Sequence, residues 1–250
     1  MNNTSEIIEV IRNNDFTNFC SSIYNDTSIL YFICIDSKKY ILKCINPELP
    51  NAEILKRKKW YCHEASLLSS KNYPSSSKVK YPKHYVFLEN LSIFGKIIPY
   101  GMLMEYIDGE ALSSKRNNVS FNRALSIVTA LLDTLEYTNE SFNYFHLDLT
   151  PENILFVEEQ YETYIIDYTG AFCEQYEGYD CHEPLDNINP VLLQHKLLCK
   201  LFDNITYPFY ENVSQASDSM WQHYLELKSS NSEITNFRHF KQIIKSVNQK

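Results

Sequence analysis

The sequence predicts an α+β protein with a β-rich first lobe that contains one main helix and a mainly helical second lobe. Runs of β-branched and aromatic residues are concentrated in the first half of the chain. A long stretch of helical periodicity follows, and the polar residues best suited to chemistry come just after it. We expect the 250 residues to form a single domain, with residues 1–105 as the first lobe and 106–250 as a reduced second lobe.

The composition suits a globular protein and excludes several classes. Apolar residues make up 44% of the chain, and the net charge of −8 argues against a nucleic-acid partner, which would need clustered Lys and Arg. The seven cysteines form no C-x-x-C pair, so we expect reduced thiols in a cytoplasmic protein. Residues 1–10 lack the apolar region of a cleaved signal, and no apolar run reaches the roughly 20 residues that span a bilayer.

The first lobe begins with a predicted hairpin and continues through a helix. Four runs rich in β-branched and aromatic residues predict strands, at residues 28–36, 40–45, 85–88 and 101–106. Pro47 and Pro50 end the second of these runs, and residues 52–69 then carry apolar side chains at helical spacing. The Ser-, Pro- and Lys-rich residues 69–83 predict a loop.

The second lobe is predicted to be mainly helical around one more hairpin. Residues 121–137 have apolar side chains three and four positions apart, which is typical of an amphipathic helix. Two short apolar runs, 154–157 and 164–166, predict the hairpin. From residue 189 onward we expect helices, interrupted near Pro208 and over residues 214–219.

Three oxygen-bearing side chains lie around the second hairpin. Asp148 and Asn153 stand in the stretch FHLDLTPENILF, and Asp167 follows the hairpin in IIDYTG. Carboxylate and amide oxygens are the ligands that Mg²⁺ prefers, and a further carboxylate can accept a proton from a hydroxyl group. Taken singly, Asp148 could cap a loop and Asp167 could begin a turn.

The same stretches resemble the signature motifs of protein kinases. His146-Leu147-Asp148 followed by Asn153 is similar to the catalytic loop H-R-D-x-x-x-x-N, and D-Y-T-G is similar to D-F-G. The resemblance implies a two-lobed protein-kinase-like fold with ATP and Mg²⁺ as cofactors. It implies that Asp148 is the general base and that Asn153 and Asp167 bind the metal.

Parts of the first lobe extend the resemblance. The run YILKC is similar to V-A-I-K, which implies that Lys43 binds the α- and β-phosphates of ATP. Glu64 on the predicted helix is the candidate anionic partner, and Glu48 and Glu53 are rivals that lie closer to the lysine in sequence. A strand lysine can also be a solvated edge charge, and a helical glutamate can form a surface ion pair that contributes little.

The run Leu103–Tyr106 resembles the kinase hinge, so backbone groups of Glu105 and Ile107 are expected to bind adenine. The chain departs from the family elsewhere. Residues 15–27 contain no glycine where protein kinases have a Gly-rich loop, Thr150 replaces a lysine, and no A-P-E follows D-Y-T-G. These losses favour an acceptor other than an extended peptide.

A second resemblance suggests which acceptor. Residues 81–112 together with IIDYTGAFC are similar to bacterial lipopolysaccharide core heptose kinases. This resemblance implies a role in lipopolysaccharide biosynthesis, with a sugar hydroxyl of an anionic glycolipid as acceptor at the inner membrane face. The basic cluster Lys56–Lys59 would then make peripheral contact with phosphate or membrane, although a solvated helix face explains it equally well.

Two other interpretations stay open. A minimal Ser/Thr protein kinase, such as a bacterial effector, would transfer phosphate to a protein hydroxyl. A pseudokinase would bind partners without catalysis, which the missing glycines favour and the presence of Asp148, Asn153 and Asp167 opposes.

Overall fold

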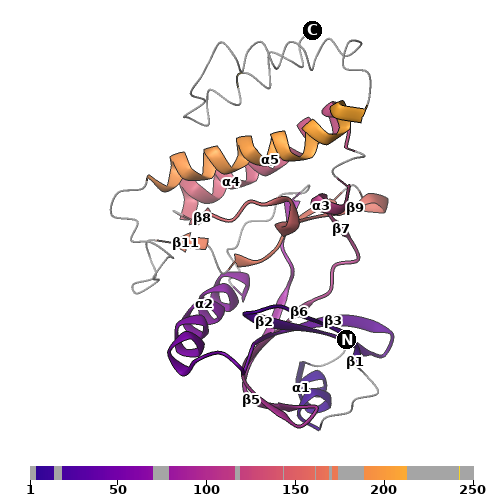
Figure 1. The fold of residues 1–250 in the computed structure, drawn as a ribbon, viewed down its shortest axis with the longest axis vertical. Coiled ribbons are helices and arrows are strands. Elements are labelled where there is room, and N and C mark those ends of the chain that lie inside the picture. Colours follow the sequence, from indigo (N-terminus) through magenta and orange to yellow (C-terminus); the bar gives the residue numbers. More distant parts are fainter. Residues whose placement is uncertain are drawn as a thin grey trace. The chain divides into compact units, whose positions relative to one another are not determined.

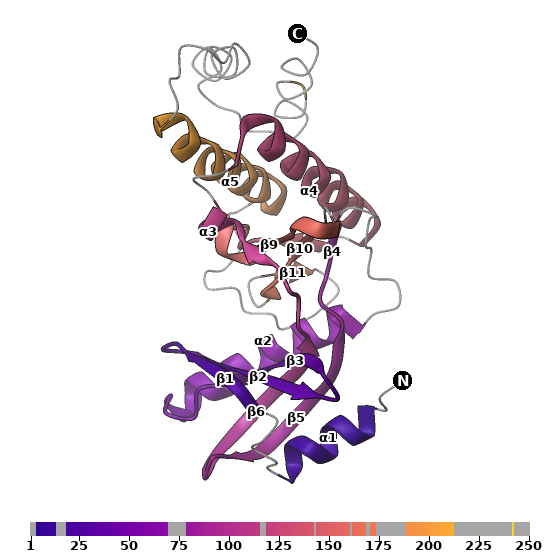
Figure 2. The same cartoon turned by 90° about the vertical axis from the view of Figure 1, so that its right-hand side faces the viewer.

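The computed structural model describes residues 4–13, 19–69, 79–115, 119–142, 144–160, 162–168, 171–173, 189–212 and 242. The chain divides into two compact units (Figures 1 and 2). The first unit holds Met1–Tyr73 and Tyr81–Ile107, and the second holds Pro74–Lys80 and Asp108–Lys250. The first is rich in strands and the second carries the two longest helices, so the α+β class predicted from the sequence is confirmed.

The first unit is built on a five-stranded antiparallel sheet with the order β1-β2-β3-β6-β5. Its strands are β1 (Phe19–Tyr24), β2 (Ser28–Ile35), β3 (Lys38–Ile45), β5 (His84–Ile93) and β6 (Lys96–Glu105). The four predicted strands are all present. β5 and β6 are longer than predicted because they form one hairpin, whose turn has positive φ at Phe94 and Gly95, 50° and 76°.

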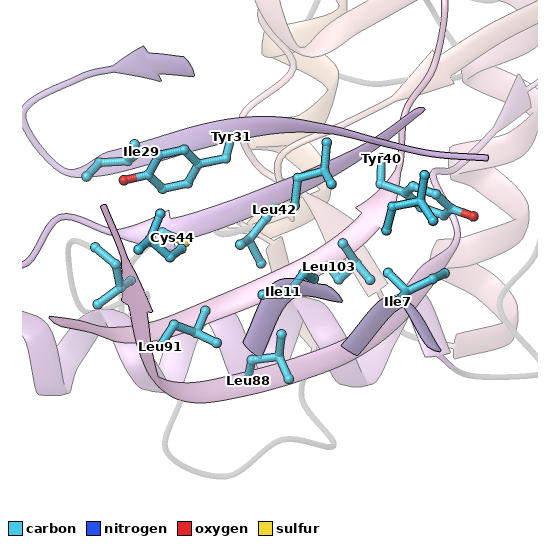
Figure 3. Packing of buried hydrophobic residues seen from close by; sticks show 14 residues of the cluster. Ile7, Ile11, Ile29, Tyr31, Tyr40, Leu42, Cys44, Leu88, Leu91 and Leu103 are labelled. Carbon is cyan, nitrogen blue, oxygen red and sulfur yellow. The ribbon is translucent and has the colours of Figure 1, made fainter. Parts of the chain in front are cut away.

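Helix α1 (Thr4–Arg12), which the sequence reading missed, covers one face of this sheet. Figure 3 shows Ile7 and Ile11 directed at side chains of β3, β5 and β6. Alternate residues of β2 point to this face, because side chains along a strand alternate between the two faces of a sheet. The β2 residues that are buried on this face of the sheet are Ile29, Tyr31, Ile33 and Ile35.

Helix α2 (Asn51–Ser69) belongs to a second apolar cluster, formed with the opposite face of the sheet. Tyr61 and Ala65 of the helix are buried with Ile45, Met102 and Met104 of the strands. This is the helix predicted from residues 52–69. The face of β3 that points toward α2 also carries Lys43, since Lys43 lies two residues from Ile45.

The second unit contains the long helices α4 (Phe121–Phe142) and α5 (Pro190–Asn212), which lie side by side in both views (Figures 1 and 2). The rings of Phe121 and Phe202 meet edge to face with centroids 5.5 Å apart. The prediction that the helix breaks near Pro208 is wrong, since α5 continues to Asn212. Packing of its buried residues Leu198, Leu201, Phe202 and Ile205 outweighs the local cost of the proline.

Short strands complete the second unit. One sheet has the order β4-β10-β9-β7, with β4 (Val79–Lys80), β10 (Glu162–Ile165), β9 (Ile154–Val157) and β7 (Glu110–Ala111). Its central pair is the hairpin predicted from the sequence. A second pair joins β8 (Tyr144–His146) to β11 (Ala171–Cys173), and α3 (Leu112–Lys115), η3 (Pro151–Asn153) and η4 (Glu158–Gln160) are single turns. Among the residues that the structure describes, no helix combines the length and apolarity needed to cross a bilayer.

Candidate active site

Within the first unit, a buried ion pair joins β3 to α2. Lys43 Nζ lies 2.8 Å from Glu64 Oε2, and their side chains are 9% and 0% exposed. The ammonium group also lies 5.2 Å from the centre of the Tyr61 ring, where a cation–π interaction is favourable. The two other glutamates considered as partners of Lys43 form ion pairs of their own, Glu48 with Lys96 and Glu53 with Arg57. A charge that is removed from water requires such a partner, so Glu64 fixes the position of the lysine.

Half-buried apolar side chains flank this lysine on the same face of the sheet. Leu30 of β2 is the cross-strand partner of Lys43, and Phe32 is the partner of Ile41. Phe32 also contacts Tyr106 edge to face, with centroids 6.0 Å apart. The first unit therefore presents a buried cation beside an apolar strip that suits a flat ring.

The segment predicted to be a hinge follows the end of β6. The backbone N–H of Glu105 donates to the carbonyl of Lys83 at 2.8 Å, and Glu105 Oε2 accepts from the N–H of Lys83 at 3.1 Å. This amide is thus engaged within its own unit, and a contact from Glu105 to a base would use its carbonyl. Ile107 is 8% exposed.

The turn between β1 and β2 achieves its shape without glycine. Asn25 Oδ1 accepts from the backbone N–H groups of Thr27 and Ser28, at 3.1 and 2.5 Å. Asn46 then ties the turn to the end of β3, since its N–H and Nδ2 donate to the carbonyls of Thr27 and Asp26 at 3.1 and 3.3 Å. The Asn25 side chain thus accepts from two backbone amides of this turn, where the resemblance to protein kinases implies a Gly-rich loop.

In the second unit, the turn η3 brings Asn153 to Asp148. Asn153 Nδ2 donates to Asp148 Oδ2 at 2.8 Å and to the carbonyl of Asp148 at 3.0 Å. The backbone of Thr150 closes the loop between them, because it donates to the carbonyl of Asp148 and accepts from the N–H of Asn153, both at 3.0 Å. The amide of Asn153 therefore orients one carboxylate oxygen of Asp148.

Asp167 is attached to the same loop through the preceding residue. The N–H of Ile166 donates to the carbonyl of Asn153 at 2.9 Å. Asp167 itself has φ of 59°, the left-handed conformation that residues with a side chain seldom adopt. Strain of this kind is found where a site holds a side chain in a required direction. Thr169 and Gly170, the remainder of the motif, lie outside the described residues.

A buried imidazole joins the loop of Asp148 to the strand end before Asp167. His146 Nδ1 accepts from the N–H of Asp148, and His146 Nε2 donates to the carbonyl of Ile166, both at 3.3 Å. Burial lowers the pKa of His146, against the opposing influence of the Asp148 and Asp167 carboxylates. The ring is therefore neutral, with its proton on Nε2. Sequence reasoning treated this histidine only as part of a motif and missed its positioning role.

The donors at this site fit a magnesium ion. Among the described residues, no group of three His, Cys, Asp or Glu side chains could hold a metal. Mg²⁺ does not need such a cage, because it is usually bound by one or two carboxylates together with phosphate oxygens and water. Asp167 would supply a carboxylate, and Asn153, whose Nδ2 is directed at Asp148, would supply an amide oxygen.

The parts that motivated the fold prediction occur in the expected order. A strand lysine pairs with a helix glutamate, and a long helix, the loop of Asp148 and Asn153, a hairpin and Asp167 follow. This is the order that the resemblance to protein kinases implies.

Similarity to known proteins was found among solved structures. No family model and no curated protein matches the chain. Among solved structures, the kinase PK-1 of the Cydia pomonella granulovirus is similar over 68% of this chain, with 17% sequence identity and a TM-score of 0.44. The match covers 57% of the viral kinase, so the chain spans little more than half of that protein's length.

Proposed function

We propose that this chain is an ATP- and Mg²⁺-dependent phosphotransferase that moves the γ-phosphate of ATP to an acceptor hydroxyl. The observation that carries the proposal is the hydrogen-bonded arrangement of Asp148, Asn153 and the residue preceding Asp167. Phosphoryl transfer requires little covalent chemistry from the protein, so positioning and charge neutralisation supply most of the catalysis. An arrangement of two carboxylates and an amide suits that task.

Each side chain of the second unit has a distinct role in the proposal. Asp148 accepts the proton of the attacking hydroxyl, and the hydrogen bond from Asn153 to Oδ2 holds the carboxylate in one orientation. Asp167 and Asn153 would hold Mg²⁺, which neutralises charge on the phosphates when it is bound. The ring of His146 holds the backbones of Asp148 and Ile166 in place through one hydrogen bond to each. It takes no proton in the reaction, because burial keeps it neutral.

The first unit is proposed to bind the nucleotide. Lys43, held by Glu64, contacts the α- and β-phosphates. Leu30 and Phe32 contact the adenine ring, whose edge is bound by backbone groups of Glu105 and Ile107. The ion pair supports this part of the proposal, because a pre-oriented cation loses little entropy when it binds phosphate.

As acceptor we propose a sugar hydroxyl of the bacterial lipopolysaccharide core, with the chain working in the cytoplasm at the inner membrane face. The resemblance of residues 81–112 to heptose kinases supports this choice. The basic cluster of α2 supports it only in part, since Arg57 and Lys58 are paired with Glu53 and Glu89.

Two other functions have specific support. The stretch His146–Asn153 is more similar to the catalytic loop of protein kinases, which favours a protein Ser or Thr as acceptor. The Asn25 turn favours a pseudokinase, because its occupied amides offer less to a triphosphate.

Incubation with γ-labelled ATP and Mg²⁺ separates the three functions. We expect label in lipopolysaccharide core and none with Asp148→Ala, while Glu159→Ala, which removes an exposed carboxylate of the same unit, retains transfer. Label found only in protein Ser or Thr would establish the second function. No transfer to either acceptor, together with no thermal shift from Mg·ATP, would support the pseudokinase interpretation and exclude the other two. A nucleotide at 100 times its Kd should stabilise the fold by about 2.7 kcal/mol.

A further inference from the structure

We infer that Tyr61 of α2 is a positioning residue for Lys43, which it holds through its aromatic ring. Tyr61 is 2% exposed, and the centre of its ring lies 5.2 Å from Lys43 Nζ. Its hydroxyl group donates to the backbone carbonyl of Cys44 at 3.2 Å. One buried side chain therefore contacts both the ammonium group of the lysine and the backbone of the next residue on β3. The consequence for nucleotide binding rests on the proposed function.

The spacing of residues along α2 brings two side chains to the same lysine. Tyr61 and Glu64 are three positions apart, so they lie on one face of the helix. Glu64 Oε2 lies 2.8 Å from Lys43 Nζ and supplies the opposite charge. The face of an aromatic ring is negative, so the Tyr61 ring supplies a second favourable contact. A buried ammonium group has lost most of its water, and these two contacts from one helix compensate for that loss.

The hydroxyl group of Tyr61 ties the same helix to β3. Cys44 follows Lys43 in the strand, so the hydrogen bond to its carbonyl lies within one residue of the lysine. A rotation of α2 that broke this bond would also carry Glu64 away from Lys43. Because a pre-oriented cation loses less entropy when it binds phosphate, a lysine held in this way should bind a nucleotide more tightly.

The affinity for Mg·ATP, measured by titration calorimetry on the full chain, tests the inference. Tyr61→Phe keeps the ring and should bind within about threefold of the unsubstituted chain, since a neutral hydrogen bond contributes modestly. Tyr61→Leu also removes the ring and should bind about 10-fold more weakly than Tyr61→Phe. Trp60→Leu is the matched control, because Trp60 is also 2% exposed on α2 but its ring faces Lys56 and Arg57. This control should lose thermal stability and keep its affinity for Mg·ATP.

The NMR signal of the Lys43 ammonium group tests the same contact without a nucleotide. An aromatic ring at this distance shifts the proton resonances of the lysine, and loss of the signal in Lys43→Arg assigns it. The shift should persist in Tyr61→Phe and disappear in Tyr61→Leu. An unchanged signal in Tyr61→Leu would overturn the inference, and so would equal affinities of the two Tyr61 variants for Mg·ATP or an equal loss of affinity in Trp60→Leu. If the unsubstituted chain does not bind Mg·ATP but the signals differ as expected, the proposed function fails and the positioning contact stands.

Discussion

Replacing Glu64 by alanine should strongly destabilise the first unit. The Glu64 side chain is 0% exposed and lies 2.8 Å from Lys43 Nζ, whose own side chain is 9% exposed. The substitution removes the buried carboxylate of this ion pair, and breaking a buried pair at one partner costs about 3–5 kcal/mol. Glu48 provides the matched control, because it pairs with Lys96 at 2.9 Å but the two side chains are 72% and 51% exposed. Such exposed pairs contribute about 0–1 kcal/mol, so Glu48→Ala should change little.

Urea unfolding measured by tryptophan fluorescence provides the assay. The chain has two tryptophans, so a Trp221→Phe background leaves Trp60 of α2, which is 2% exposed, as the reporter. The double variant Lys43→Met, Glu64→Met should recover most of the lost stability, since apolar residues can replace a buried pair at small cost. A loss for Glu64→Ala no larger than that for Glu48→Ala would refute the reasoning.

Three further results are expected. Burial lowers the pKa of His146, so its neutral form stabilises the fold above the ordinary pKa of about 6.5. That contribution is lost as the pH falls through the lower pKa of the folded state. His146→Asn should therefore make the urea midpoint depend less on pH between pH 7 and 5. His84→Asn should have a smaller effect, although burial lowers the pKa of His84 too. Asp167→Ala should abolish the dependence of ATP-induced thermal stabilisation on Mg²⁺, as titration of the metal would show. Asn25→Ala should cost about 1–2 kcal/mol in urea unfolding, because two backbone amides lose their acceptor, while Asp26→Ala should cost far less.

Local patterns predicted the elements that have strong periodicity of their own. The strands around Lys43, the helix α4 and the hairpin before Asp167 all carry apolar residues at the spacing of their class. The loop from Asp148 to Asn153 was found because its spacing resembles a known motif. In each case the information lies within a dozen or so neighbouring residues.

Helix α1 was missed although its own residues carry a helical pattern, whereas the missed strands depend on residues that are distant in sequence. β1 (FCSSIY) contains two serines and is a strand because β2 pairs with it. β7 and β4 have two residues each and exist only beside β9 and β10. A hydrogen bond between the side chain of Gln194 and the backbone of His146 joins positions 48 residues apart, and only the packing of α5 brings them together. No pattern within a short window of the sequence carries such information.

The place of α1 in the chain affects how the first unit can assemble during synthesis. Ile7 and Ile11 leave the ribosome well before Leu88 and Leu103, which complete the cluster that buries them. At roughly 5–20 residues per second, the apolar side of the helix must wait several seconds for its last partners. A nascent chain that stops short of β5 would expose this surface to other nascent chains. We therefore expect the first unit to fold late and to need protection from aggregation until β6 has emerged.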